Sequence, residues 1–548
     1  MKAAIRTSLM VCIALMSVRI FAQQKDWQSV AAGDPILQAM HAELERSKSQ
    51  LKLDQVAAPY YIEYRVFDVD EYSAEAEYGA LRSSVRSRGR ILRVVVRIGD
   101  YKQDSYFGQG EGALSVLGLD NDIPAFRHEL WLATDRAYKA AAEALAEKQA
   151  QLKQFTVDEP TDDFSRADAA QSVGPVVKLE FDPAPWNRML EEATGLYKND
   201  SQIETFGSTL RFQATNRYYV NSEGTVVRSG QTSYEMSISC STQATDGMHL
   251  HRNNGFVETS LAKMPTPQAF ITRASELVQS LRALREAPIA EEEYRGPVLF
   301  SADAACSIFA DLVGENVLGH KPPLGKSGRT TTAFATSYKS RVLPDFISVV
   351  DDPTISSYVG HTLMGNYELD DEGVPGRRVS LIDNGVLMNF VLGRKPVRDF
   401  PSSNGHGRAR IPSNSPGPSL SNLIVRSSQA VSVEELKKKF LDICRQRDLP
   451  YCYRVETFGP KLVPRLLYKV WSKDGHEELV RGAVLGDLDL RSLRSDLVAA
   501  GGDVYVDNML LNVPHSIVAP SVLFDELEVK RASLNKEKLP EYPPPLVH

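Results

Sequence analysis

The segment RRVSLIDNGVLMNFVLGR (residues 377–394) carries the strongest local structural signal in the chain. Two apolar runs flank Asn384 and Gly385, and an Asn-Gly pair supplies the positive φ values that a tight hairpin turn requires. The segment therefore predicts two antiparallel strands. Similar short runs make up most of the sequence after residue 297, so we expect short strands to dominate the last part of the chain.

The first half of the chain combines longer strands with helices. Alternating, β-branched runs at 59–70 and 90–100 predict an antiparallel sheet. Apolar residues at helical spacing predict a helix at 34–52 with Asp34 as its N-cap. Further helices are expected at 127–153, 185–198, 267–286 and 433–448. The predicted fold class is α+β, with an N-terminal α/β half that has an antiparallel sheet and long helices. A C-terminal β-rich domain of barrel- or sandwich-like form follows it.

The length of the chain predicts several domains, because 548 residues are too many for a single hydrophobic core. Two charged stretches, 158–174 and 286–297, have the composition of linkers. We therefore expect an N-terminal α+β domain at 23–165, a central α+β domain at 166–290 and a C-terminal β-rich domain at 291–548.

The N-terminus has the features of a secretory signal peptide. Lys2 and Arg6 precede an apolar run at 9–18, and the small residue Ala22 comes before a polar stretch. The run is about half as long as a bilayer-spanning helix requires. We expect cleavage near Ala22, with removal of residues 1–22. The mature protein is then expected to be periplasmic or secreted, with no membrane span.

The positions of the cysteines permit one disulfide but do not decide whether it forms. Four cysteines remain after residues 1–22, and an oxidising compartment permits disulfides. Cys444 and Cys452 are the only pair close in sequence. They either form a bridge at a helix-to-strand corner or remain two small buried apolar residues.

Four segments of the last third form a recognisable set. They are DDEGVPGRRVSLIDNGVLMNFVLGR (370–394), SSNGHGRAR (402–410), SNLIV (421–425) and KVWSKDGHEELVRGAVLGDL (469–488). Together they resemble the TldD/PmbA (TldD/TldE) family, and the likeness extends more diffusely over most of residues 55–540. That family comprises zinc metallopeptidases of the TldD type and metal-free companion subunits of the TldE (PmbA) type. The resemblance implies an α/β front half, a β-rich rear half and a peptide-cleaving chamber between two related subunits.

The metal motif of that family is degenerate in this chain. Family peptidases carry a motif like HEAVGH on a helix, and the aligned segment here is ENVLGH. Glu315 stands in place of the first histidine, Asn316 in place of the glutamate and His320 in place of the second histidine. The glutamate takes a proton from metal-bound water, which an amide cannot do, so its loss should lower the rate by about 10²–10⁴-fold. No residue is therefore assigned a catalytic role.

A zinc site built from Glu315 and His320 alone would be weak, although a carboxylate can ligate zinc. The resemblance also implies a cysteine ligand from a later glycine-rich segment, and the comparable stretches at 465–482 and 499–508 contain none. We therefore expect no metal and no cofactor. The alternative is an active zinc peptidase with a rebuilt ligand set, in which His320 and Glu315 act with His361 or His406.

A glycine-rich loop supplies the candidate binding residues. Such a loop can bring backbone N–H groups and guanidinium donors close to a peptide carboxylate or carbonyl. The predicted peptide-binding residues are Asn404, Gly405, His406, Gly407 and Arg408. The competing interpretation is an ordinary flexible surface loop.

The acidic run Asp370-Asp371-Glu372 lacks the alternating acids and the closing glutamate of a calcium loop. We expect a solvated turn whose carboxylates pair with Arg377 or Arg378.

These observations predict an exported, TldD/PmbA-like protein without metal. It would bind peptide or unfolded polypeptide and act as a companion subunit of a peptidase assembly, as a homodimer or as a heterodimer with a TldD-type relative. A third possibility is a purely structural assembly subunit. Nucleic acid is not an expected partner, because 63 Lys and Arg residues face 70 Asp and Glu residues and no basic face stands out.

Overall fold

The computed structural model describes residues 33–154, 160–291, 293–326, 329–409, 415–510 and 513–533. The predicted signal peptide at 1–22 lies outside these residues. The α-helices are α2 (Pro35–Gln50), α3 (Ile123–Leu152), α4 (Pro183–Gly195), α5 (Pro267–Glu286), α6 (Ala302–Phe309), α7 (Val433–Gln446) and α8 (Leu490–Ser495). The strands of the first half are β1 (Tyr61–Glu77), β2 (Ala80–Arg97), β3 (Ala113–Leu117), β4 (Gln171–Val173), β5 (Thr205–Asn221), β6 (Val226–Gln243) and β7 (His249–Glu258). The main strands of the second half are β8 (Glu293–Phe300), β9 (Ile347–Asp351), β12 (Val379–Asp383), β13 (Val386–Leu387), β16 (Asn422–Ser427), β17 (Tyr451–Phe458), β18 (Pro464–Trp471), β19 (Glu477–Val480), β20 (Ala483–Leu485), β21 (Leu497–Ala500), β22 (Tyr505–Met509), β23 (His515–Ala519) and β24 (Val522–Arg531). Short two-residue strands are β10 (Ser357–Tyr358), β11 (His361–Thr362), β14 (Gly407–Arg408) and β15 (Gly417–Pro418).

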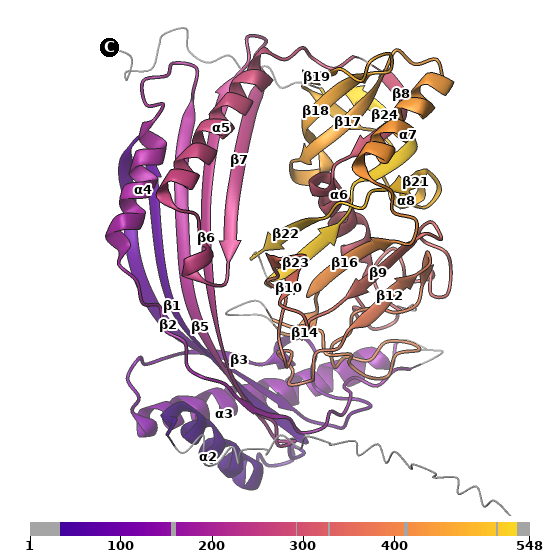
Figure 1. The fold of residues 1–548 in the computed structure, drawn as a ribbon. Helices are drawn as coiled ribbons and strands as arrows, with labels where there is room; N and C mark the ends of the chain where they lie inside the picture. The colour runs from indigo at the N-terminus through magenta and orange to yellow at the C-terminus, as the bar shows by residue number, and fades with distance from the viewer. Residues whose placement is uncertain are drawn as a thin grey trace, which may run out of the picture.

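One long, curved sheet runs through the whole first half (Figure 1). Its strands lie in the order β3-β2-β1-β5-β6-β4, and β7 pairs with β6. Strand β1 pairs with β5 in an antiparallel register that extends from Glu63–Asn221 to Glu77–Gly207. Because β1 comes from the predicted domain 23–165 and β5 from the predicted domain 166–290, the two predicted units share a single sheet.

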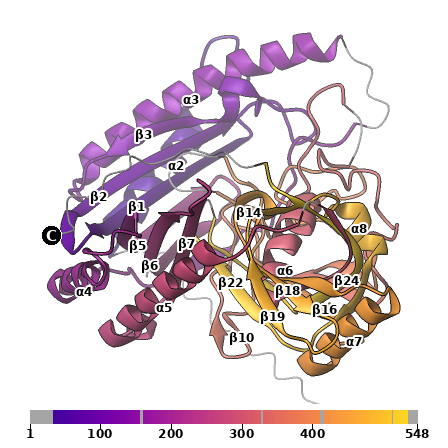
Figure 2. The same ribbon diagram turned by 90° about the horizontal axis from the view of Figure 1, so that it is seen from above.

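The helices of the first half cover one face of this sheet. Successive side chains of a strand point to opposite faces, so the even-numbered residues of β1 share one face. Ile62, Tyr64 and Val66 are buried in one cluster with side chains of α2 and α3. Further along, Tyr72 and Ala74 are buried in a second cluster with α4 and α5, which lie side by side (Figure 2). The odd-numbered face of the strand is left to meet the second half of the chain.

The second half consists of two sheets that share one core. Six strands lie in the order β13-β12-β9-β16-β23-β22, and a second sheet has the order β19-β18-β17-β8-β24-β20 with β21 paired to β24. Helix α6 lies where the sheets meet, and a single cluster of buried apolar side chains includes residues of both. The prediction of an α+β chain with a sandwich-like, β-rich rear half is confirmed.

Local sequence signals placed several elements correctly. Helix α5 has the predicted bounds, and Asp34 caps α2 by accepting hydrogen bonds from the backbone N–H groups of Ile36 and Leu37. Strands β12 and β13 form the predicted hairpin, with φ values of 46° at Asn384 and 80° at Gly385. A Cβ at Gly385 would lie 2.2 Å from the Leu343 carbonyl oxygen, so the turn also needs glycine for space.

Among the residues that the structure describes, both stretches predicted as linkers lie in part within ordered elements. Within 158–174, residues 171–173 form β4, which pairs with β6, and Phe164 is 2% exposed. The guanidinium carbons of Arg97 and Arg394 lie 3.8 and 3.9 Å from the centre of the Phe164 ring. The second stretch, 286–297, runs into β8. The charged composition of these stretches did not indicate that Phe164 is buried in the first or that the second contains the start of β8.

The disulfide that the sequence did not decide is present, between Cys444 and Cys452. The sulfur atoms of Cys444 at the end of α7 and Cys452 in β17 are 2.07 Å apart, and the Cα atoms are separated by 6.1 Å. Of the two alternatives, a bridge at a helix-to-strand corner or two separate buried residues, the structure shows the bridge. Cys240 and Cys306 are buried free thiols.

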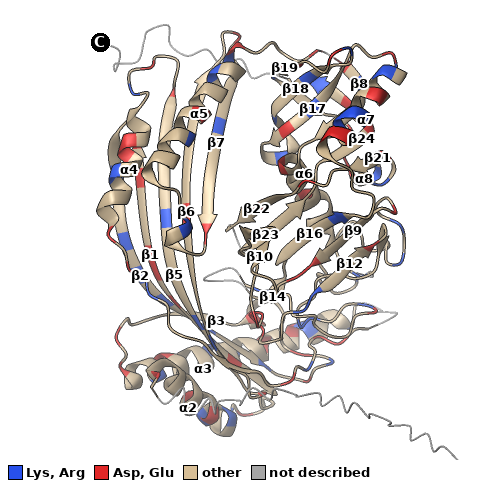
Figure 3. Ribbon diagram, in the orientation of Figure 1, with Lys and Arg blue, Asp and Glu red and all other residues tan. Residues whose placement is uncertain are grey.

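Acidic and basic residues are interspersed along the strands of both halves in the view of Figure 3. Across the part of the chain that the structure describes, no helix combines the length and the apolar character that crossing a bilayer demands.

A fully buried arginine joins the two halves. The Arg394 guanidinium donates to the Ser165 carbonyl oxygen at 3.0 and 2.6 Å and to Glu223 Oε1 at 2.8 Å. The same guanidinium stacks on Phe164, as described above. Because a buried charge is tolerated only with partners of good geometry, these contacts fix the second half against the sheet.

We predict that Arg394→Gln lowers the free energy of unfolding by about 3–5 kcal/mol, because it leaves the Glu223 carboxylate without its buried partner. Urea unfolding monitored by tryptophan fluorescence measures the change. Arg377→Gln, at an exposed position of the same half, is the matched control and should leave the unfolding midpoint unchanged. Equal midpoints for both variants would contradict the role given to Arg394.

Candidate functional site

The segment aligned with the metal motif is not a continuous helix. Helix α6 begins after Ser301, whose hydroxyl accepts a hydrogen bond from the Ala304 N–H, and ends at Phe309. A wide turn at 310–314 and a 3₁₀ turn at Glu315–Val317 follow, and Leu318 is already extended, with φ −77° and ψ 119°. The motif of family peptidases lies on a helix, whereas the helical turns of this chain end at Val317. The backbone between Glu315 and His320 is therefore a 3₁₀ turn followed by an extended segment, and not a regular helix.

Asn316 is tied into the chain by its amide. Its Nδ2 donates to the Leu312 carbonyl oxygen at 2.9 Å, and its Oδ1 accepts from the Ala333 N–H at 2.9 Å. The Asn316 carbonyl oxygen also accepts from the Thr332 hydroxyl at 2.8 Å. An ionised carboxylate has no donor and could make only the second of the two side-chain bonds. The residue in the position of the catalytic base is thus used to connect the end of the helical segment to the loop after it.

The residues present do not fit the zinc ion that the family resemblance implies. His320 is solvent-accessible; partial burial lowers its pKa, and the nearby Glu315 carboxylate offsets part of this effect. These two residues supply fewer ligands than the three protein ligands of a catalytic zinc site. Within the described ranges, no group of three or more His, Cys, Asp or Glu side chains is placed to hold a metal ion.

The predicted binding loop is largely internal. His406 is fully buried, and its ring nitrogens lie 3.0 Å from Asp351 Oδ1 and 3.0 Å from Asn404 Oδ1. Asn404 also bonds the backbone of the neighbouring strand segment, accepting from the Leu392 N–H at 2.9 Å and donating to the Phe390 carbonyl oxygen at 2.8 Å. These side chains hold the loop in place, so the interpretation as a flexible surface loop is wrong.

The two glycines of the loop serve close packing. A Cβ at Gly405 would lie 2.1 Å from the Pro375 carbonyl oxygen, and Gly405 has φ +80°. A Cβ at Gly407 would lie 2.0 Å from Glu372 Oε2. Both positions therefore need glycine because backbone or a buried carboxylate occupies the space.

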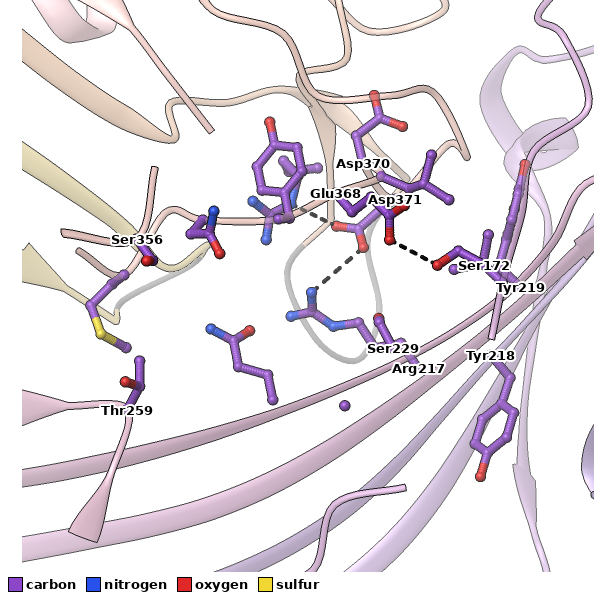
Figure 4. A pocket seen from close by; sticks show the side chains of 18 of the residues that line it. Ser172, Arg217, Tyr218, Tyr219, Ser229, Thr259, Ser356, Glu368, Asp370 and Asp371 are labelled. Carbon is purple, nitrogen blue, oxygen red and sulfur yellow. Dashed lines mark hydrogen bonds and ion pairs between the residues drawn. The ribbon is translucent and has the colours of Figure 1, made fainter. Parts of the chain in front are cut away.

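Arg408, the last of the predicted binding residues, lines a cavity. The cavity has a volume of about 390 Å³ and lies between the odd-numbered face of the sheet and the second half of the chain (Figure 4). Among its lining residues are Arg65, Arg217 and Gln231 from the sheet, and Tyr367, Asp371 and Arg408 from the second half. Of the five predicted residues, Arg408 is the one that this cavity exposes to a ligand.

The acidic run is buried rather than solvated. Asp370 is 4% exposed and accepts hydrogen bonds from the backbone N–H groups of Glu372, Val374 and Gly407 at 2.8–2.9 Å. Burial raises the pKa of Asp370, and the charge of Glu372 adds to the effect. The prediction of a solvent-facing turn is therefore wrong.

Asp371 pairs with arginines that the sequence did not indicate, instead of Arg377 or Arg378. Its Oδ2 accepts from Arg408 Nε at 3.3 Å, and its Oδ1 lies 3.7 Å from Arg217 Nη1. Burial alone would raise the pKa of Asp371, but the guanidinium groups of Arg217, Arg408 and Arg65 lower it overall. Arg65, a charged residue inside the predicted strand at 59–70, was the available signal, since charged residues are rarely buried without a partner.

Comparison with known proteins agrees with this architecture. Residues 293–444 match the family model described as the PmbA/TldA metallopeptidase C-terminal domain. A metalloprotease from Methanocaldococcus jannaschii is 24% identical over 246 residues, which are 44% of this chain and 50% of that protein. A metalloprotease TldD homologue from Buchnera aphidicola is 30% identical over 95 residues, 17% of this chain and 19% of that protein. The chain thus matches half or less of the length of these relatives.

Solved structures share the whole fold. TldE from Thermococcus kodakarensis superimposes with a TM-score of 0.59 at 14% identity, covering 90% of this chain and 100% of that chain. A Thermotoga maritima protein described as a candidate modulator of a DNA gyrase has a TM-score of 0.58 at 16% identity, covering 89% and 99%. The fold and the matched C-terminal domain define a metallopeptidase-like protein of two halves. Residues 293–444 carry the C-terminal domain of the PmbA/TldD family, in agreement with the resemblance of the segments around residues 370–394.

We predict that Asn316→Asp lowers the free energy of unfolding by about 1–3 kcal/mol, because the carboxylate cannot donate to the Leu312 carbonyl oxygen. Chemical unfolding measures the difference. Glu315→Gln makes the reverse exchange, of a carboxylate for an amide, at the neighbouring exposed position and should have little effect. A stability of the Asn316→Asp variant equal to that of the parent would show that the amide donor is not used.

Proposed function

We propose that this chain is an exported, metal-free protein of the TldE/PmbA type that binds peptide or unfolded polypeptide. It acts as a companion subunit of a peptidase assembly, pairing with a second copy or with a TldD-type relative. The single observation that carries the proposal is the use of the Asn316 amide. Its donor and its acceptor are both engaged by the chain, at the position where proton abstraction would need a carboxylate.

The disulfide supports the proposed export. Disulfides persist in the periplasm and outside the cell, and are rare in the cytosol. The Cys444–Cys452 bridge joins a helix to the strand that follows it, so it is part of the folded domain. Together with the signal-like sequence at 1–22, it favours a mature protein that functions in an oxidising compartment.

The rebuilt zinc site is the weaker alternative. It requires His361 or His406 as a further ligand beside His320 and Glu315. His406 is fully buried, and both of its ring nitrogens are within hydrogen-bonding distance of Asp351 and Asn404. Recruiting His406 would leave the Asp351 carboxylate without that partner, at a cost in stability. A purely structural subunit, which binds no ligand, would not explain the cavity beside Arg408.

We predict that the purified mature chain holds far less than one zinc ion per chain and cleaves no peptide in a chelator-sensitive way. The reason is the incomplete ligand set at Glu315 and His320. Elemental analysis and a peptidase assay with and without a chelator test this. One zinc per chain that is lost in His320→Ala but kept in the matched control His249→Ala, at an exposed histidine outside the alternative ligand set, would overturn the proposal.

We also predict that an unfolded polypeptide raises the melting temperature of the mature chain, since a ligand that binds only the folded state stabilises it. Reduced and alkylated lactalbumin is a suitable probe, with the native, disulfide-bonded form as control. Calorimetry or fluorescence melting measures the shift. The same melting temperature with both forms would favour the structural subunit instead.

A further inference from the structure

Three arginines from distant parts of the chain converge at the inner end of the cavity. Arg65 lies in β1, Arg217 in β5 and Arg408 in β14. The side chains of Arg65 and Arg408 are 3% and 4% exposed, and that of Arg217 is 15% exposed. Arg65 is paired with Tyr219 in the β1–β5 register, so Arg217 is its diagonal neighbour on the same face of the sheet. Placing three guanidinium groups in one buried site is costly unless negative charge balances them.

The carboxylates within reach do not balance this charge. Asp371 lies among all three arginines, at 3.3 Å from Arg408 Nε and 3.7 Å from Arg217 Nη1, and its carbonyl oxygen accepts from Arg65. Glu63 Oε1 lies 3.3 Å from Arg65 Nη2. In the described part of the chain, Asp371 and Glu63 are the two carboxylates that form ion pairs with the three guanidinium groups. The charge of the buried Glu372 also acts on Arg65, but its Oε2 accepts from the Arg394 backbone N–H at 2.6 Å. Burial lowers the pKa of Arg217, and the positive charges of Arg408 and Arg65 lower it further against the effect of Asp371.

The other acidic residues of the cavity are engaged elsewhere. Asp370 accepts from three backbone N–H groups, and burial raises its pKa. Glu368 is exposed at the rim, where its Oε2 accepts from the Ser172 hydroxyl at 2.8 Å (Figure 4). Neither carboxylate forms an ion pair with the arginine cluster in the described part of the chain.

Several guanidinium nitrogens of the cluster are left without an acceptor. Within the described residues, Arg65 Nε and Nη1, Arg217 Nε and Arg408 Nη1 are buried and make no hydrogen bond. Nearly all buried donors in folded proteins are paired, and an unpaired charged donor is more costly than a neutral one. Donors in excess, positive charge in excess and an adjoining cavity of about 390 Å³ together define a site for an anion.

We propose that Arg65, Arg217 and Arg408 form a carboxylate-binding site, which takes the terminal carboxylate or an acidic side chain of a peptide. Guanidinium groups match planar carboxylates through paired N–H donors. The cluster already accommodates one carboxylate, that of Asp371, so a carboxylate fits it better than a tetrahedral anion. The peptide origin of the ligand rests on the proposed function, whereas the carboxylate chemistry rests on the arginines alone.

The test uses a matched ligand pair on the mature chain. N-acetyl-leucine should raise the melting temperature, and N-acetyl-leucinamide, which lacks the charge, should not. A fluorescent peptide with a free C-terminus should bind at least about tenfold more tightly than its C-terminal amide. If an amidated peptide with an internal glutamate binds as tightly as the free acid, an acidic side chain is the natural source of the carboxylate.

The variant Arg217→Gln should remove the preference for the free acid. Its matched control is Arg211→Gln, on the same strand and the same face, where Arg211 pairs with Glu71 and does not line the cavity. The ligand pair on the unmodified chain keeps the test informative if Arg217→Gln folds poorly. Equal effects of N-acetyl-leucine and N-acetyl-leucinamide, or an equal effect of inorganic phosphate, would overturn the proposal. A response to N-acetyl-leucine without any binding of peptides would retain the carboxylate site and reject the proposed peptide function.

Discussion

Buried arginines that bond across the boundary between the long sheet and the second half of the chain are the constraint on which the rest of the structure depends. Arg394 reaches from the second half to Ser165 and Glu223, and Arg65 reaches from β1 to the Asp371 carbonyl oxygen. Charges in such an interior are stable only in a narrow range of positions, because each needs its partners at hydrogen-bonding distance. The two halves are therefore held in one arrangement, and that arrangement creates the cavity beside Asp371.

The sequence predicted the elements whose signals are local. Helix α5 and the β12–β13 hairpin were found because a cap, a period or a turn residue lies within the element itself. The buried charges were not found, because their partners are distant in sequence. Arg65 and the Asp371 carbonyl oxygen are 306 residues apart. An acidic run is usually exposed, and nothing near residue 371 indicated that strands of the first half would supply its arginines.

The candidate site shows the same difference between features with a local sequence signal and features that depend on distant contacts. Aligning the family motif identified Glu315, Asn316 and His320 as the residues at the metal-motif positions. The alignment did not indicate that the helical turns end before His320. The glycines around His406 were interpreted as bringing the loop backbone close to a bound peptide, whereas their small size allows close packing against Pro375 and Glu372. A glycine pattern alone does not separate these two uses, since both require a missing Cβ. Tertiary contacts decided which one applies.

The long sheet also has a consequence for how the chain is made. Strand β1 has two neighbours, β2 directly after it and β5 from much later in the sequence. While a ribosome has completed only β1 to β3, the β5-facing edge of β1 has its N–H and C=O groups open to any other extended polypeptide. This edge closes only when Asn221 has emerged and β5 can dock. Until β5 docks, this edge of β1 is therefore a site at which the incomplete chain can aggregate.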